Sequence, residues 1–333
     1  MLLDLGSPVV LKHRMAEALG MERVDLRVLE VSAPVVVDLH RAIVGPATPT
    51  VAVEVDRQRT EADPDSVDVG QSTADALLEA LVSNIHGVLG DDLVGIYLYG
   101  SYVSGGFDAG ASDLDLVAVT STEVVRIDLV GLEQVHQDIV RKDPEWSDRI
   151  ECVYIGRAAL RSFRTSPGPL AVISPGEPFH LRNDRPLEWL QNWYLIRQTG
   201  VALYGLPADA VIPPITRTEF VAATARYAKE TAGRSLAGAS PGSLAYAVLT
   251  MCRAYRTVRT LSPGSKQEGA GWTRDRMPEW AGLIDAALRC RLSRGTYGFD
   301  DEPTRIAAER FIGLLAAEIE RYWAAKGRPL VPD

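Results

Sequence analysis

The pattern of apolar and polar positions divides the chain into a first half of alternating strands and helices and a second half that is helical. Short apolar runs at 93–99, 113–119 and 149–155 have the length of buried strands. Apolar residues spaced by three and four predict helices over 73–86 and 123–140. The first half therefore predicts a sheet with helices packed against it.

Beyond residue 157 the pattern changes. Residues 157–184 contain four prolines and are predicted to be irregular. Helical periodicity then predicts helices over 187–197, 217–232, 243–261 and 303–325, a series that is typical of a helical bundle. We expect an α/β (α+β) domain with a mixed sheet, followed by an all-helical bundle domain.

The amino-acid composition limits the classes of protein to which the chain can belong. With 333 residues, 46% hydrophobic and 24% charged, the chain has room for two globular domains. No apolar run reaches the roughly 18 residues that a membrane span needs, and no basic region followed by an apolar segment begins the chain. Its three cysteines have neither disulfide nor metal-ligand spacing, so we expect a cytoplasmic protein. A net charge of −9 disfavours a nucleic-acid partner and is compatible with a small polycationic one.

The stretch 95–117 carries the clearest chemistry. Gly100 has no Cβ atom, so a phosphate can approach the backbone there, and Ser101 is placed to cap a short helix with an anion-binding N-terminus. Asp113 and Asp115 are two residues apart on a predicted strand, so both carboxylates point to one face. Such a pair suits Mg²⁺, the usual companion of a nucleoside triphosphate, although a turn with solvated aspartates is the alternative.

The order strand, Gly-Ser, about a dozen residues, Ser-Asp-Leu-Asp-Leu and strand resembles the signature of the DNA polymerase beta-like nucleotidyltransferases. This resemblance implies a nucleotidyltransferase fold for the first domain. It also implies that Gly100, Ser101 and Ser112 bind the triphosphate of ATP, and that Asp113 and Asp115 bind Mg²⁺.

Glu151 is the one acidic residue inside the third predicted strand. Alternation places it on the same face as Val153 and Ile155. From the pattern alone it is an exposed strand residue. The resemblance implies instead that it supplies a third carboxylate and acts as general base on an acceptor hydroxyl.

The helical half carries a narrower resemblance. Residues 197–207 are similar to the Gly-Val-x-Leu-Tyr-Gly-x-Pro passage of aminoglycoside adenylyltransferases of the streptomycin/spectinomycin type. Residues 247–253 resemble their Val-Leu-x-Leu-x-Arg helix, and residues 266–278 resemble their Lys-x5-Trp-Ala-x2-Arg-Leu-Pro run. The chain departs from the family at Thr273, where alanine is expected, and its acceptor-binding residues between 170 and 192 cannot be aligned.

Two further residues are assigned by this resemblance. It implies that Lys266 lies near an interdomain cleft and binds the nucleotide, and that Trp272 helps to form the aminoglycoside pocket. The alternatives are an exposed loop lysine and a tryptophan in helix packing.

The expected organisation has three parts: an N-terminal extension with a linker over 1–70, a nucleotidyltransferase domain over 71–165 and a helical acceptor-binding domain over 166–330. The extension has no assigned role. Residues 23–44 faintly resemble the last strand and helix of a minimal nucleotidyltransferase, so a degenerate, non-catalytic remnant is the alternative to a simple extension.

The resemblance implies Mg²⁺-dependent transfer of AMP from ATP to a hydroxyl of an aminoglycoside-like acceptor, a resistance-type reaction that releases pyrophosphate. Three alternatives stay open: AMPylation of a protein or RNA, modification of another amino-sugar metabolite, and a catalytically silent nucleotide-binding regulator.

Overall fold

The structure, a computed structural model, describes residues 66–326 except 109, 111, 167, 184–188, 294, 296 and 300, and only the backbone of 66–72. The chain separates into two compact units, Met1–Ser72 and Thr73–Asp333. The expectations for residues 1–65 lie outside the described residues. All contacts below belong to the second unit.

A six-stranded mixed sheet with the order β5-β4-β3-β2-β1-β6 forms the first half of this unit. Its strands are β1 (Leu93–Tyr99), β2 (Leu114–Thr120), β3 (Ile150–Gly156), β4 (Leu170–Ser174), β5 (Glu177–Arg182) and β6 (Val201–Gly205). The β2–β3 pair is parallel and the other pairs are antiparallel. A parallel pair needs a crossover connection, and α4 (Leu129–Lys142) supplies it.

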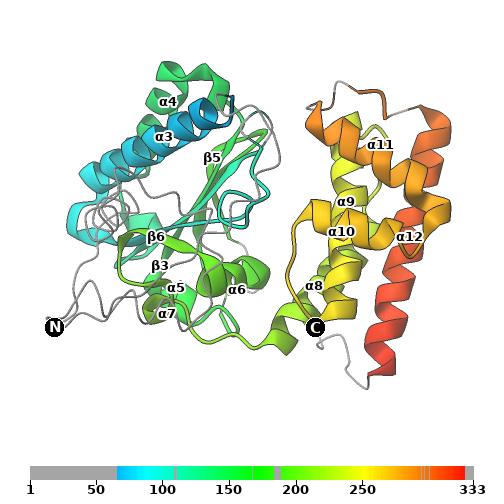
Figure 1. Cartoon of the computed structure of the whole chain (residues 1–333). Coiled ribbons are helices and arrows are strands. Elements are labelled where there is room, and N and C mark those ends of the chain that lie inside the picture. The colour runs from blue at the N-terminus through cyan, green and yellow to red at the C-terminus, as the bar shows by residue number, and fades with distance from the viewer. Residues whose placement is uncertain are drawn as a thin grey trace, which may run out of the picture. The chain divides into compact units, whose positions relative to one another are not determined.

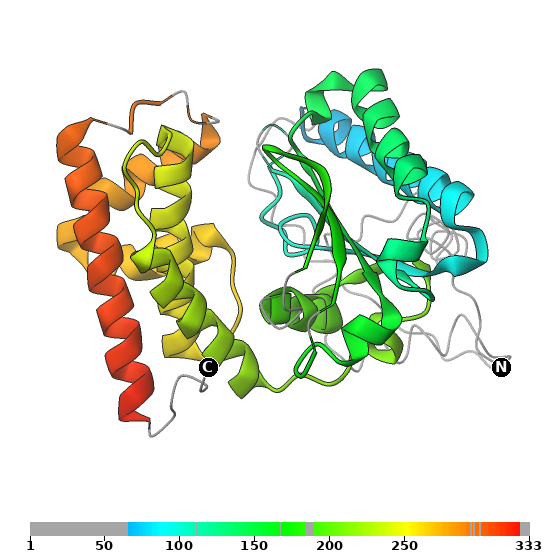
Figure 2. The ribbon, with the colours of Figure 1, turned by 180° about the vertical axis from the view of Figure 1, so that it is seen from behind.

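The sheet separates two apolar cores. Helix α3 (Ser66–Leu89) and α4 lie together over one face, as Figures 1 and 2 show. The other face packs on α5 (Arg157–Arg161) and α6 (Leu190–Thr199), and its core continues into the helical half. Alternation along β3 follows this division, since Val153 and Ile155 belong to the second core and Cys152 and Tyr154 to the first.

The helical half is built around one central helix. Its helices are α7 (Ala208–Val211), α8 (Arg217–Gly233), α9 (Pro241–Thr260), α10 (Lys266–Arg274), α11 (Ala281–Leu292) and α12 (Glu302–Ala325). Helix α9 contacts α8, α10, α11 and α12, and its buried stripe includes Leu244, Val248 and Met251. The predicted mixed sheet followed by a helical bundle is confirmed. No helix among the described residues combines the length and apolar character that spanning a membrane requires.

Three local predictions are wrong. Residues 170–182 form an antiparallel hairpin instead of irregular structure, because Pro169 precedes β4, Pro175 lies in its turn and Pro178 lies on an edge strand, where the missing N–H is tolerated. The short helix expected after Ser101 is a turn, in which Gly105 adopts a φ of 78°. Helix α3 also begins at Ser66, earlier than the predicted Thr73.

Candidate active site

Three neighbouring strands bring the predicted carboxylates together. In the sheet register Asp115 of β2 lies opposite Tyr99 of β1 on one side and opposite Glu151 of β3 on the other. Residues paired across strands point to the same face. Asp113 precedes β2 by one position and is two residues from Asp115, so the strand periodicity gives it the same face.

The Gly100–Ser101 turn lies directly against this group. Gly100 has a φ of 72°, and a Cβ atom there would overlap the Oδ2 atom of Asp115. The backbone N–H of Ser104 donates to the Gly100 carbonyl, and that of Gly106 donates to the Ser101 carbonyl. The Tyr102 hydroxyl donates to Asp75 of α3. Glycine is therefore required at position 100 by both conformation and space.

A second loop fixes the entry into β2. The Asp108 N–H donates to the Ser112 hydroxyl at 2.9 Å, and the Ser112 N–H donates to the Asp108 carbonyl at 2.8 Å. The buried Arg149 guanidinium donates twice to the Ser112 carbonyl, at 3.1 and 2.7 Å. Ser112 thus holds the loop that carries Asp113, and its predicted contact with a nucleotide stays a prediction.

Burial raises the pKa of all three carboxyl groups, and repulsion from neighbouring carboxylates adds to the rise for Asp115 and Glu151. Burial raises the pKa of Asp113, while Lys266, Arg149 and Arg291 oppose the rise. Burial, helped by Glu151 and Asp113, raises the pKa of Asp115 to about 7. Burial and Asp113 also raise the pKa of Glu151, against the hydrogen bond from Tyr99 and the charge of Lys266. Clustered carboxylates of this kind favour a bound cation.

The structure brings Lys266 to these carboxylates from the helical half. Lys266 is the first residue of α10, and its Nζ atom lies 3.9 Å from the centroid of the Tyr246 ring. Its charge acts on Asp113, Asp115 and Glu151. Burial, with the neighbouring Arg253 and Arg291, lowers the pKa of Lys266 to about 7. The two arginines were missed from the sequence, although Arg253 falls inside the resemblance.

Trp272 is placed differently. Its ring makes an edge contact with Tyr255 of α9, with centroids 5.4 Å apart, and Arg276 lies 3.8 Å from its centroid. Its contacts are therefore those of helix packing. A role of Trp272 in acceptor binding stays a prediction.

Two residues beside Glu151 were also missed from the sequence. The Tyr99 hydroxyl donates to Oε1 of Glu151 at 3.2 Å, and the side-chain amide of Asn192 on α6 donates to the same hydroxyl at 3.2 Å. Burial and the nearby Glu151 and Asp115 raise the pKa of Tyr99 well above its ordinary value, which keeps the hydroxyl protonated. The strand pattern marks Tyr99 only as a buried apolar position.

The donor set fits Mg²⁺. Within the described residues, no group of three or more His, Cys, Asp or Glu side chains could hold a metal ion by itself. Mg²⁺ commonly takes one or two carboxylates together with substrate phosphates. Asp113 and Asp115 would supply hard oxygen ligands for such an ion.

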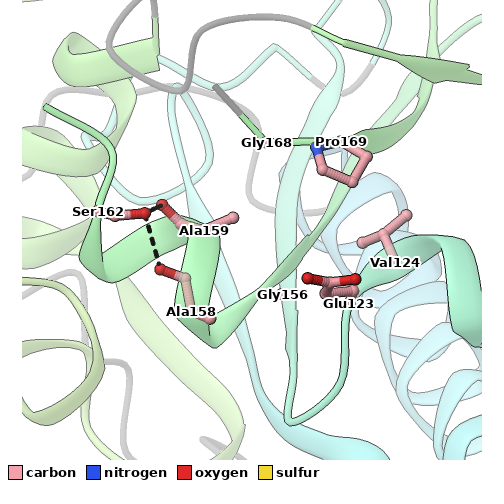
Figure 3. Close-up of a pocket in the computed structure, with 8 residues that line it drawn as sticks. All are labelled: Glu123, Val124, Gly156, Ala158, Ala159, Ser162, Gly168 and Pro169. Carbon is pink, nitrogen blue, oxygen red and sulfur yellow. Dashed lines mark hydrogen bonds between the residues drawn. The ribbon is translucent and has the colours of Figure 1, made fainter. Parts of the chain in front are cut away.

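A separate small pocket of about 170 Å³ lies at the other end of the strands. It is lined by Glu123, Val124, Gly156, Ala158, Ala159, Ser162, Gly168 and Pro169 (Figure 3). Gly156 follows Glu151 by five strand positions, about 17 Å at the usual rise per residue. The pocket is lined by none of the predicted site residues.

Comparisons with known proteins agree with this architecture. Residues 83–166 match the family described as nucleotidyltransferase domain, and residues 210–316 match the family described as aminoglycoside adenylyltransferase, C-terminal domain. No curated protein sequence matches the chain.

Among solved structures, the chain is similar to spectinomycin adenyltransferase AAD(9) from Enterococcus faecialis, determined with ATP and spectinomycin. The TM-score is 0.58 at 18% identity, with 74% of this chain and 98% of that chain covered, which shows a shared fold. Together with the shared fold, the two matched domains support an aminoglycoside adenylyltransferase of the nucleotidyltransferase superfamily.

Proposed function

We propose that the chain transfers AMP from ATP to a hydroxyl group of an aminoglycoside-like acceptor and releases pyrophosphate. The observation that carries the proposal is the grouping of Asp113, Asp115 and Glu151 beside the Gly100 turn, with Lys266 acting on all three. The similar AAD(9) structure, determined with ATP and spectinomycin, supports the choice of nucleotide and acceptor.

The reaction is an in-line displacement at the α-phosphorus, in which positioning and electrostatics supply most of the rate. The Gly100–Ser101 turn admits the triphosphate, and Lys266 compensates its negative charge. Glu151 accepts the proton of the attacking hydroxyl, and such a base contributes on the order of a hundred-fold or more. Mg²⁺ held by Asp113 and Asp115 would lower the pKa of the hydroxyl and neutralise the leaving pyrophosphate.

The negative charge of the chain and of its proposed site indicates the class of acceptor. An aminoglycoside carries several ammonium groups, and the chain has a net charge of −9 with three clustered carboxylates at the proposed site. We therefore infer a resistance-type activity toward a small polycationic acceptor.

Pyrophosphate release from ATP and Mg²⁺ tests the proposal, with streptomycin, spectinomycin, kanamycin or buffer alone as acceptor. We expect release with streptomycin or spectinomycin, and none with buffer. Asp113→Asn should abolish release while its circular dichroism spectrum and thermal unfolding stay those of the wild type. Binding of ATP without release in any mixture would contradict the proposed acceptor, and a search for AMP-labelled protein or RNA would follow.

A further inference from the structure

We propose that Tyr99 and Asn192 are positioning residues that hold Glu151 in the orientation needed to accept the acceptor proton. This inference rests on the proposed function of Glu151 as general base. It assigns a role to two residues that neither the motif nor the charge of the site identifies.

The hydrogen bonds have a fixed direction. A tyrosine hydroxyl has one proton, and an amide N–H can only donate. Because Asn192 donates to the Tyr99 hydroxyl, the hydroxyl proton is directed to Oε1 of Glu151. One carboxylate oxygen is thereby held in place.

Both supporting residues lie on rigid parts of the fold. Tyr99 is only 4% exposed and lies in the register position next to Asp115. Asn192 precedes two core residues of α6: Trp193 is fully buried, and Tyr194 stacks on Phe220 of α8 with centroids 4.3 Å apart. A chain of packed side chains therefore fixes the amide that orients the hydroxyl.

Loss of orientation affects turnover more than binding. The carboxylate stays present when its support is removed, but it spends less time in the reactive geometry, and small misplacements can cost ten- to a hundred-fold in rate. Neither Tyr99 nor Asn192 contacts the Gly100–Ser101 turn through these hydrogen bonds, so binding of ATP should be preserved.

Tyr99→Phe removes the hydroxyl and keeps the ring. We expect kcat to fall about ten-fold or more, with the KM for ATP within about two-fold. Tyr97→Phe is the matched control, because Tyr97 lies on the same strand and its hydroxyl donates to the Leu206 carbonyl at 2.9 Å. Equal kcat values for Tyr99→Phe and the wild type would overturn the inference.

Asn192→Asp keeps the shape of the side chain and reverses its polarity. An aspartate accepts the Tyr99 proton and withdraws it from Glu151, whereas Asn192→Ala leaves the hydroxyl able to donate to Glu151. We expect Asn192→Asp to lower kcat more than Asn192→Ala, and Gln191→Glu, which adds the same charge one residue away, to retain kcat. A larger loss in Asn192→Ala would indicate a packing role only and would contradict the inference.

Crystal structures of the wild type and Tyr99→Phe give a readout that needs no turnover. We expect one Glu151 rotamer bonded to Tyr99 in the wild type and a displaced or multiple rotamer in the variant. An unchanged Glu151 in Tyr99→Phe would overturn the inference. An ordered Glu151 in a wild type that transfers no AMP would overturn the proposed function instead and leave the positioning role standing.

Discussion

At the scale of single residues, Gly100 is the most constrained position of the proposed site. Its left-handed φ of 72° strains any residue with a side chain, and its missing Cβ makes room for the Asp115 carboxylate. Gly105, in the same turn, has a φ of 78° but nothing within 4 Å of where its Cβ would lie. A substitution at Gly105 therefore introduces backbone strain alone, whereas a substitution at Gly100 introduces strain and also crowds the Asp115 carboxylate.

We predict that Gly100→Ala abolishes transfer, because the new methyl group forces the Asp115 carboxylate to rotate away. Its loss of stability should be of the order of 1–3 kcal/mol, and Gly105→Ala should lose about as much. Urea unfolding and pyrophosphate release measure the two effects. Retained activity in Gly100→Ala, or equal loss of activity in both variants, would contradict the assigned role of the turn.

The buried His136 predicts acid sensitivity. Burial lowers the pKa of His136 from 6.5 to about 4. Its Nε2 lies 2.8 Å from the Tyr154 hydroxyl, while its Nδ1 has no hydrogen-bond partner within the described part of the chain. Between these pH values the unfolded chain binds a proton that the folded chain does not bind, so stability is full above pH 6.5 and falls toward pH 4.

For His136→Gln we predict a flatter dependence of stability on pH. The wild type should lose up to about 3 kcal/mol more than this variant between pH 6.5 and pH 4, because 2.5 pKa units correspond to roughly that free energy. Urea unfolding at several pH values measures the difference. Parallel pH curves for the two proteins would show that His136 is not the origin of the acid sensitivity.

The residues of the site differ in how far the sequence predicts them. Asp113 and Asp115 are indicated by their two-residue spacing after a Gly-Ser turn. Glu151 has the pattern of an exposed strand residue, and only the family resemblance assigns it to the site. Tyr99 and Asn192 have no such signal, because their role depends on hydrogen bonds between β1, β3 and α6. Such pairings are set by the register of the sheet and by tertiary packing.

At the scale of elements, helix α10 connects the bundle to the proposed site through its first turn. The Ser265 hydroxyl accepts from the Glu268 N–H at 3.1 Å, and the Glu268 carboxylate accepts from the Ser265 N–H at 2.6 Å. This capping box fixes the position of Lys266, the first residue of the helix. Helix α8 begins with an equivalent box made by Thr216 and Glu219.

We predict that Ser265→Ala and Thr216→Ala each lose about 1 kcal/mol of stability, the usual cost of removing a helix cap. Only Ser265→Ala should also raise the KM for ATP, by roughly three- to ten-fold, because fraying of α10 displaces Lys266. Thermal unfolding and steady-state kinetics separate the two effects. An equal rise of KM in both variants would contradict the special position of α10.

Element prediction succeeded where periodicity was strong and unbroken. Helices α8, α9 and α12 were predicted to within a few residues because their buried stripes repeat at helical spacing. The β4–β5 hairpin was missed because its prolines outweighed a short apolar run, and edge strands accept proline. Helices α10 and α11 were not predicted, and α10 is short and rich in glycine and charge.

At the scale of the whole molecule, the sheet separates a structural face from a chemical face. Helices α3 and α4 cover the face that carries Cys152 and Tyr154, while Asp115 and Glu151 share the opposite face with the core that reaches the bundle. The alternation along three strands predicts this division. The tertiary fold places Lys266 close enough to these carboxylates for their charges to interact. In the sequence, only the family resemblance indicated that Lys266 belongs to the site.

In the proposed reaction the adenylyl group, and no other part of ATP, moves to the acceptor. The most direct measurement incubates the wild type and Asp113→Asn with spectinomycin or streptomycin and ATP labelled at either the α- or the γ-phosphorus. We predict that the α-label appears on the acceptor and the γ-label in pyrophosphate, and that Asp113→Asn moves neither. A γ-label on the acceptor would show phosphoryl transfer and would contradict the proposed function.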